Sequence, residues 1–137
     1  MSQENVEIVR NAMNAYNSGG GIEAMLAFIH SEAVTYPFPE WPEDSVYRGH
    51  EGARRLTAVW TEPFDEYAGE VHEIRDCGDQ VVWLGWSTGR IKGAGTPIRQ
   101  PLGAVFSRFR DGMIGEGRFF LAWEEALEAA GVSEREL

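Results

Sequence analysis

The side chains best able to do chemistry lie on a predicted hairpin, GAVFSRFRDGMIGEGRFFLAW, which covers residues 103–123. Its two strands meet at a tight Asp111-Gly112 turn. Glu116 and Arg118 are two residues apart, so their side chains project from the same face of one strand. Facing inward they would offer an acid and a cation to a substrate; facing outward they would form an ion pair within the chain or across a dimer. We predict that they face outward.

The remaining reactive side chains give no catalytic or metal-binding pattern. His30, His50 and His72 have no acid or nucleophile beside them in the sequence, so we predict surface or loop histidines. His50 deserves more notice than the others because it precedes a predicted helix. Cys77 is the only cysteine, so it cannot form an internal disulfide and is predicted to be an inert thiol. No catalytic residue, metal ligand or cofactor site is therefore assigned.

Composition limits the class of protein and of partner. A chain of 137 residues that is 43% hydrophobic predicts one domain, 1–137, with one core. The net charge of −10 argues against nucleic acid, which requires a patch of Lys and Arg. No apolar stretch approaches the roughly 20 residues that span a bilayer, and the first ten residues are polar, so we predict a cytoplasmic protein without membrane contact. A neutral or apolar small molecule, or another protein chain, is the expected partner.

Hydrophobic periodicity predicts helices before strands. Apolar residues at spacings of three and four indicate two helices that form a hairpin. The first is capped by Ser2 and ends at residues 19–21, and the second covers 22–29; a third helix follows over 51–62. Four strands, joined as a meander, and a last short helix should follow, at 70–76, 80–91, 98–110, 113–122 and 123–130. The order predicts an α+β fold in which the helices pack on one face of an antiparallel sheet.

The other face of the sheet should also be covered. In VVWLGW, residues 81–86, both alternating sets of side chains are apolar, whereas a sheet with one wet face alternates apolar and polar residues. We expect no spare helix to cover this face. A second copy of the chain, bound as a two-fold homodimer through the outer face of the sheet, is the predicted cover.

Several local motifs resemble one superfamily when they are taken in order. They are the opening MSQENVEIVRNAMNAYNSG, YRGHEGARRL, CGDQVVWL, FRDGMI and the closing EEALEAAGVSE. In this order they resemble the NTF2-like superfamily, in particular an actinobacterial-type branch of the SnoaL-like polyketide cyclase group. The resemblance implies a cone-shaped, curved antiparallel sheet packed on an N-terminal helical hairpin and a third helix. It also implies a pocket between helices and sheet, a homodimer and no organic cofactor.

The resemblance also argues against two reactions of this superfamily. The catalytic aspartate of limonene-epoxide hydrolases aligns with Phe119 here. The pocket tyrosine, general base and second acid of ketosteroid isomerases align with Ala12, Pro37 and Val105. Apolar residues thus replace every one of these polar groups, so neither epoxide hydrolysis nor steroid isomerisation is expected.

The same alignments predict which side chains line the pocket. Residues expected to face inward from the strands are Leu84, Trp86, Thr88, Val105, Ser107, Gly117, Phe119 and Leu121, joined by Tyr16, Tyr36 and Trp60. The first interpretation is a pocket that binds or converts a small, largely apolar ligand resembling a polyketide, terpene or steroid, without a cofactor. Conversion would resemble the acid/base chemistry of polyketide cyclases or isomerases. The alternatives are a non-enzymatic homodimerising module whose pocket is incidental or a filled core, and a degenerate hydrolase.

Overall fold

Three helical segments form one layer of the fold. The computed structural model describes residues 2–42 and 46–132. Helix α1 (Ser2–Ala15) ends in a turn at which Gly19 takes a φ of 98°, a conformation that glycine adopts without strain. The chain then reverses into α2 (Gly21–Met25), as the predicted hairpin requires. Helix α3 (Gly49–Thr61) begins two residues before its predicted start, and Pro63 follows its end.

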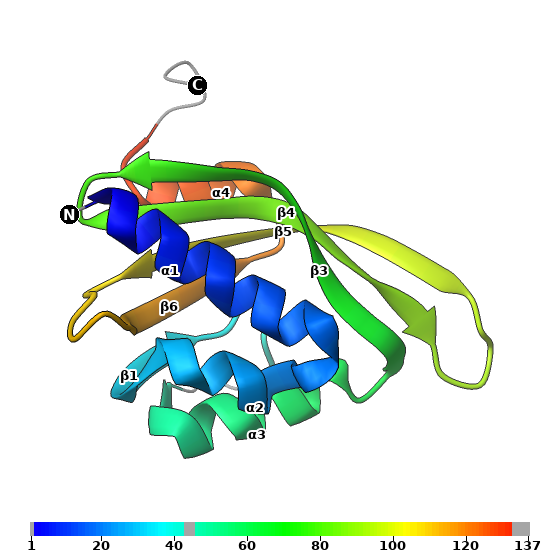
Figure 1. The fold of residues 1–137 in the computed structure, drawn as a ribbon. Helices are drawn as coiled ribbons and strands as arrows, with labels where there is room; N and C mark the ends of the chain where they lie inside the picture. The colour runs from blue at the N-terminus through cyan, green and yellow to red at the C-terminus, as the bar shows by residue number, and fades with distance from the viewer. Residues whose placement is uncertain (1, 43–45, 133–137) are drawn as a thin grey trace.

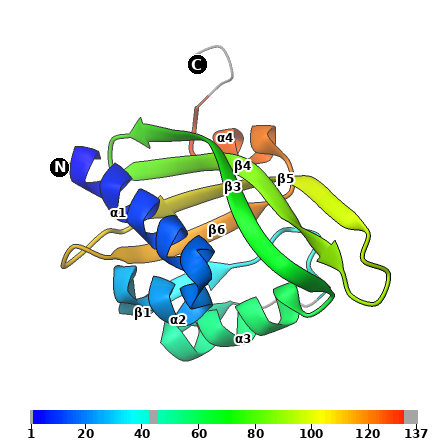
Figure 2. The same ribbon diagram turned by 45° about the vertical axis from the view of Figure 1, so that its right-hand side comes forward.

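The strands form one curved, six-stranded sheet in the order β2-β1-β6-β5-β4-β3 (Figures 1 and 2). Their bounds are β1 Ile29–Tyr36, β2 Tyr47–Arg48, β3 Phe64–Cys77, β4 Gln80–Ile91, β5 Pro97–Ser107 and β6 Ile114–Phe120. The predicted meander is confirmed for β3 to β6. The sheet is mixed rather than wholly antiparallel, because β1 lies parallel to β6. A parallel pair needs a long crossover, and α3 with the four strands β2 to β5 supplies it here.

The inner, concave face of the sheet packs on the three N-terminal helices (Figure 2). Val9 and Ala12 of α1 are fully buried there. Trp83 of β4 and Phe106 of β5 meet them from the sheet in the larger hydrophobic cluster. This α+β arrangement is the predicted one.

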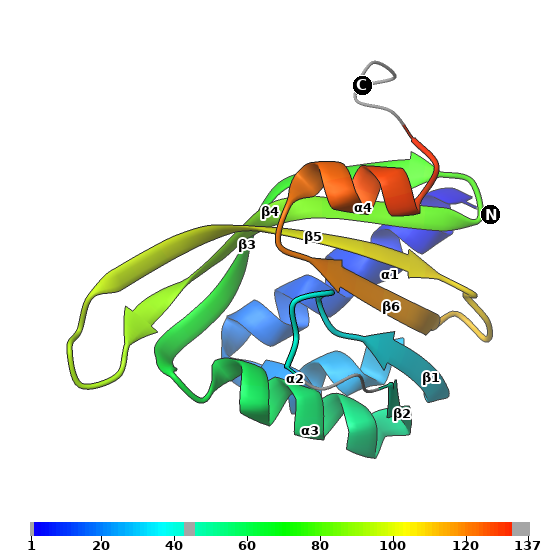
Figure 3. The same cartoon turned by 180° about the vertical axis from the view of Figure 1, so that it is seen from behind.

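Helix α4 (Trp123–Ala129) lies on the opposite face of the sheet (Figure 3). Its residues Ala126 and Leu127 are buried in a second cluster with strand residues that include Val82. A β-carbon on Gly103 would lie 2.8 Å from the β-carbon of Ala126, so the helix approaches the backbone of β5 closely. The expectation that no helix is free to cover this face is therefore wrong, and α4 explains why VVWLGW is apolar on both sides.

No helix in the described part of the chain is long and apolar enough to cross a membrane.

Candidate functional site

Strand register decides which side chains point to the inner, concave face of the sheet, which encloses the interior of the cone. Ala104 of β5 pairs with Trp83 on one side and with Phe119 on the other, and paired residues project to the same face. All three belong to or pack on the cluster under α1, which lies on the inner face. Leu84 and Val105 are one residue along, and both are buried in the cluster under α4. The inward direction predicted for Leu84 and Val105 is therefore wrong.

The position of the tight turn in the last hairpin was sufficient to derive the correct strand register. Residues on each side of Asp111-Gly112 form a β-bridge, as predicted. Counting back along both strands from this turn places Ala104, and not Val105, opposite Phe119. An error of one residue in the predicted register assigns every side chain of a strand to the wrong face. The same error therefore affected the predictions for β4 and for β5.

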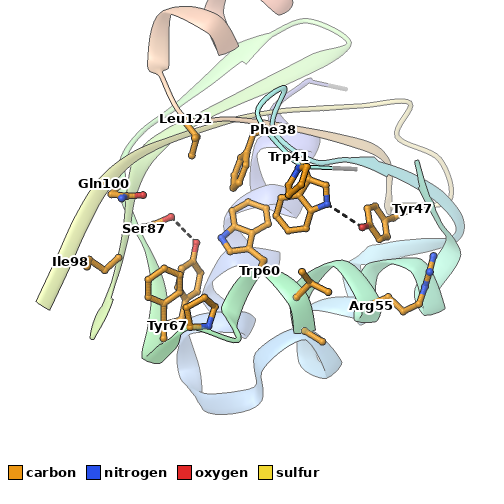
Figure 4. A pocket seen from close by; sticks show the side chains of 15 residues that line it. Phe38, Trp41, Tyr47, Arg55, Trp60, Tyr67, Ser87, Ile98, Gln100 and Leu121 are labelled. Atoms are coloured by element: carbon orange, nitrogen blue, oxygen red, sulfur yellow. Dashed lines mark hydrogen bonds between the residues drawn. The ribbon is translucent and has the colours of Figure 1, made fainter. Parts of the chain in front are cut away.

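The wide end of the cone holds a cleft of about 630 Å³ (Figure 4). Helix α3 forms its floor, the start of β3 with β4 and β5 forms one wall, and the loop after β1 forms the other. Six of its fifteen lining residues are aromatic: Phe38, Trp41, Tyr47, Trp60, Phe64 and Tyr67. The other nine are Pro42, Arg55, Ala58, Val59, Pro63, Ser87, Ile98, Gln100 and Leu121.

Trp60 is the centre of the aromatic lining. Its ring centroid lies 4.5 Å from that of Phe38, 5.1 Å from that of Phe119 and 6.4 Å from that of Tyr67, in edge-to-face contacts. Such contacts are favourable beyond the area that they bury, and they fix the orientation of the rings. Trp41 completes the group at 6.5 Å. The cleft thus presents broad, preorganised apolar walls.

A pair of hydroxyl groups is the main polar feature of the cleft. The Tyr67 hydroxyl lies 2.6 Å from the Ser87 hydroxyl (Figure 4). Burial raises the pKa of Tyr67 to about 12, although hydrogen bonds with Ser87 and Trp60 oppose the shift. Tyr67 is therefore protonated at neutral pH and acts as a neutral hydrogen-bonding group. Elsewhere in the lining, the Trp41 indole N–H donates to the Tyr47 hydroxyl at 3.2 Å.

The lining carries almost no charge. None of the fifteen described residues that line the cleft is Asp, Glu or His. Arg55 is the one charged residue among them, and its guanidinium carbon lies 5.2 Å from the Tyr47 ring centroid. Arg55 is exposed to solvent. The described lining can therefore hold a flat apolar molecule and hydrogen-bond to it, but it offers no carboxylate or imidazole as a general base.

Two smaller chambers lie deeper in the cone. One, of about 80 Å³, is lined by residues of the three N-terminal helices and the turn after α1, together with Tyr67, Gly69, Leu102 and Phe119 of the sheet. The other, of about 70 Å³, lies among α2, α3 and strands β1, β5 and β6. Trp60 lines the cleft and both chambers, and Phe119 lines both chambers. The interior is thus partly hollow and not a completely filled core.

Five of the residues predicted to face inward border these spaces. Trp60 and Leu121 line the cleft, Tyr16 lines the larger chamber, and Phe119 lines both chambers. Gly117 also lines the smaller chamber, in line with its predicted direction. These placements do not test ligand binding, which stays a prediction.

Other predicted residues lie elsewhere. Trp86 faces outward, with the Arg99 guanidinium 4.1 Å from its ring centroid, and the Thr88 hydroxyl donates to a backbone carbonyl on β3. Tyr36 is 36% exposed and pairs with Arg118 on the outer side. The inward direction predicted for Trp86 and Tyr36 is wrong, because strand register turns both away from the cone.

Ser107 and Glu116 line a polar groove that is separate from the cleft. Glu116 faces outward as predicted and accepts a hydrogen bond from Arg108 at 2.9 Å, whereas Arg118 is exposed. The ion pair of Glu116 is thus made with Arg108 across the hairpin. The acid and cation of this hairpin do not line the cleft.

Sequence reasoning missed most of the cleft. Phe64 and Tyr67 lie in a part of β3 that was not predicted as strand. Ser87 projects from the face of β4 opposite to the residues that were predicted to line the pocket. Phe38 and Trp41 belong to a proline-rich loop without periodicity. Two aromatic residues between closely spaced prolines were the available signal for that loop, since prolines hold a loop in a fixed shape.

The histidines are engaged elsewhere. His30 lies 3.2 Å from Asp111, a partner far away in sequence, and His50 donates to the Ile29 carbonyl at 2.7 Å. His72 stacks on Trp123 on the outer face. None of the three is among the described residues that line the cleft or the two chambers.

Comparison with known families agrees with this architecture. The family model of the SnoaL-like domain matches residues 9–116, most of the chain. The chain belongs to the SnoaL-like domain family. This membership confirms the predicted family and supports a small-molecule-binding domain. A search of curated proteins gave no match to this SnoaL-like chain.

Solved structures share the fold at low sequence identity. A protein from Jannaschia sp. CCS1, assigned as a SnoaL-like polyketide cyclase, is 22% identical with a TM-score of 0.72, covering 86% of this chain and 85% of its own. An NTF2-like protein from Burkholderia xenovorans LB400 is 25% identical with a TM-score of 0.67, covering 93% and 95%. A protein with a ketosteroid isomerase-like fold from Catenulispora acidiphila DSM 44928, solved with trimethylamine, is 19% identical with a TM-score of 0.70, covering 92% and 93%.

Proposed function

We propose that this SnoaL-like domain binds a small, flat, largely apolar molecule that carries a hydrogen-bond acceptor, and that it does so without a cofactor. The carrying observation is the cleft of about 630 Å³, whose walls are rich in aromatic residues and whose lining includes the Tyr67–Ser87 hydroxyl pair. Ligand sites of a few hundred Å³ with apolar walls and a few placed polar groups are typical of small-molecule binding. The trimethylamine bound to the Catenulispora protein supports the idea that this fold encloses small molecules.

The hydroxyl pair favours a ligand that accepts a hydrogen bond. Tyr67 and Ser87 together carry two hydroxyl protons, and their mutual hydrogen bond uses one. The second proton is free to be donated to a carbonyl or hydroxyl oxygen of the ligand. Since the pKa of Tyr67 is about 12, this donor persists throughout the physiological pH range.

The composition of the cleft favours binding over acid–base conversion. Deprotonation next to a carbonyl, as in polyketide cyclases, requires a base with a pKa near the working pH. The described lining residues include no carboxylate and no imidazole, and burial moves the Tyr67 pKa further from neutrality. We therefore infer a binding protein, in which Trp60 and its aromatic neighbours provide contact area.

Calorimetric titration with 2-acetylnaphthalene tests the proposal, with 2-ethylnaphthalene as the matched ligand that lacks the acceptor. Saturable binding of the ketone is expected. The double variant Tyr67→Phe/Ser87→Ala removes both hydroxyl protons and should weaken ketone binding about 2- to 10-fold, because one hydrogen bond contributes roughly 0.5–1.5 kcal/mol. Binding of the hydrocarbon should not change. Thr88→Ala, which alters the neighbouring residue on the other face, is the control and should leave both affinities unchanged.

An absence of saturable binding across a panel of aromatic ketones would favour the alternative, a non-enzymatic homodimerising module. The dimer was predicted because the outer side of residues 81–86 is apolar. Helix α4 covers most of those apolar residues, so they do not require a partner subunit. What remains for a partner is the strip of Trp86 and His72, beside the Arg99–Glu70 ion pair. Sedimentation equilibrium of the protein and of Trp86→Glu tests the proposed homodimer, which should dissociate in the variant.

A further inference from the structure

Trp60 lies where the three internal spaces meet. Its side chain lines the cleft, the chamber of about 80 Å³ and the chamber of about 70 Å³. Phe38 contacts its ring from the loop after β1, and Phe119 contacts it from β6. Phe38 lines the cleft only, whereas Phe119 lines both chambers and not the cleft. The indole therefore stands as a partition between an outer and an inner part of the cone.

The inner part has the character of a hydrocarbon site. Its lining is mostly aliphatic, sulfur-containing or aromatic, as with Met13, Met25, Ile22 and Leu56, and it includes no charged residue among the described ones. Each chamber has about half the volume of the roughly 150 Å³ apolar cavity that can take up benzene. A ring would not fit into either chamber, whereas a short alkyl chain would.

We propose that Trp60 sets the length of ligand that this domain accepts. The flat, acceptor-bearing part of the ligand lies in the outer cleft beside Ser87, and an alkyl substituent extends inward until the indole stops it. A smaller side chain at position 60 joins the cleft to both chambers and admits longer chains. Trp60 is thus a specificity-determining residue, and this inference rests on the proposed binding function.

A series of straight-chain 2-acylnaphthalenes, from acetyl to octanoyl, tests the inference by calorimetry. For the wild-type protein, affinity should stop increasing after the first few methylene groups. For Trp60→Leu, affinity should continue to increase, by about 3- to 4-fold for each further methylene that is buried. Trp41→Leu is the matched control, because Trp41 lines the cleft and neither chamber. It should lower affinity throughout the series without moving the length limit.

The outcomes separate this inference from the function on which it rests. An identical length limit in wild type and Trp60→Leu would overturn the role of Trp60 and leave the binding function standing. An absence of binding by every ketone to both proteins would overturn both. If Trp60→Leu does not fold, Trp60→Phe replaces it in the same series and should move the limit in the same direction by a smaller step; an unmoved limit would again overturn the inference.

Discussion

Both faces of the sheet carry packed aromatic residues, but the inner rings surround a cleft, whereas the outer rings of Trp86 and Trp123 pack directly on each other. On the inner face, Trp60 and its neighbours meet edge to face around a space of about 630 Å³. On the outer face, Trp123 contacts both His72 and Trp86, and the Arg99 guanidinium lies over the ring of Trp86. The Trp123 indole N–H is used as well, donating to a backbone carbonyl of β4 at 2.9 Å.

This difference shows that an aromatic composition does not by itself identify a binding site. The outer rings of Trp86 and Trp123 pack on each other, and Arg99 lies over Trp86. The inner rings that line the cleft come from a helix, a loop and two strands, and together they surround it.

The largest expected effect on the free energy of unfolding comes from a substitution on the outer face. Leu127→Ala removes a side chain of α4 that is 2% exposed, so it should lower the free energy of unfolding by about 2–5 kcal/mol. Urea denaturation measures this loss. If the two faces are independent, the affinity of the folded variant for 2-acetylnaphthalene should remain within about 2-fold of wild type. A larger loss of affinity would show that α4 supports the cleft, and the comparison would fail.

A smaller effect tests how closely α4 contacts the sheet. Gly103→Ala should destabilise the protein by about 1–3 kcal/mol, because the new methyl group would lie 2.8 Å from the Ala126 methyl group. Ala126→Gly removes that contact, so the double variant should be more stable than the sum of the two single changes predicts. Strict additivity in urea denaturation would contradict the close approach.

The smallest expected effect is the pH dependence of the free energy of unfolding that Tyr67, on the inner face, contributes. Burial raises the folded-state pKa of Tyr67 to about 12 from a reference near 10, so between these values the folded protein retains a proton that the unfolded chain has lost. This stabilisation is complete below pH 10 and should be lost at up to about 1.4 kcal/mol per pH unit as the pH rises to 12. Tyr67→Phe should reduce this dependence in urea denaturation at pH 9 and 11. Burial also raises the pKa of Tyr16, so some dependence should remain; an unchanged slope would contradict the assignment.

Much of the fold could be predicted because its signals are local. The range predicted for β4 is the observed one, and α3 and α4 begin and end within two residues of their predicted bounds. Helical spacing, prolines after helices and glycine turns act over a few residues, so they can be read from the sequence. The early part of β3 was missed because FDEYAG shows no clear alternation of apolar and polar residues.

The candidate site was predicted less well, because it depends on contacts between distant segments. Trp60, Tyr16, Phe119 and Leu121 were placed at the internal spaces, whereas Leu84, Trp86 and Val105 were assigned to the wrong face. A helix shows its buried face through its own periodicity. A strand that is apolar on both sides does not, and only its neighbours decide which side is which.

The sequence by itself determined the family, the α+β class and the order of α1, α2, α3, β3 to β6 and α4, but it did not place β1 and β2 in the sheet. The tertiary structure alone decided that α4 covers the outer face, that β1 joins the sheet in parallel, and that the Tyr67–Ser87 pair meets Trp60 in an open cleft. The physical reason is range: backbone preferences and hydrophobic spacing act within one segment, whereas facing, coverage and cavities arise only where segments far apart in the chain come into contact.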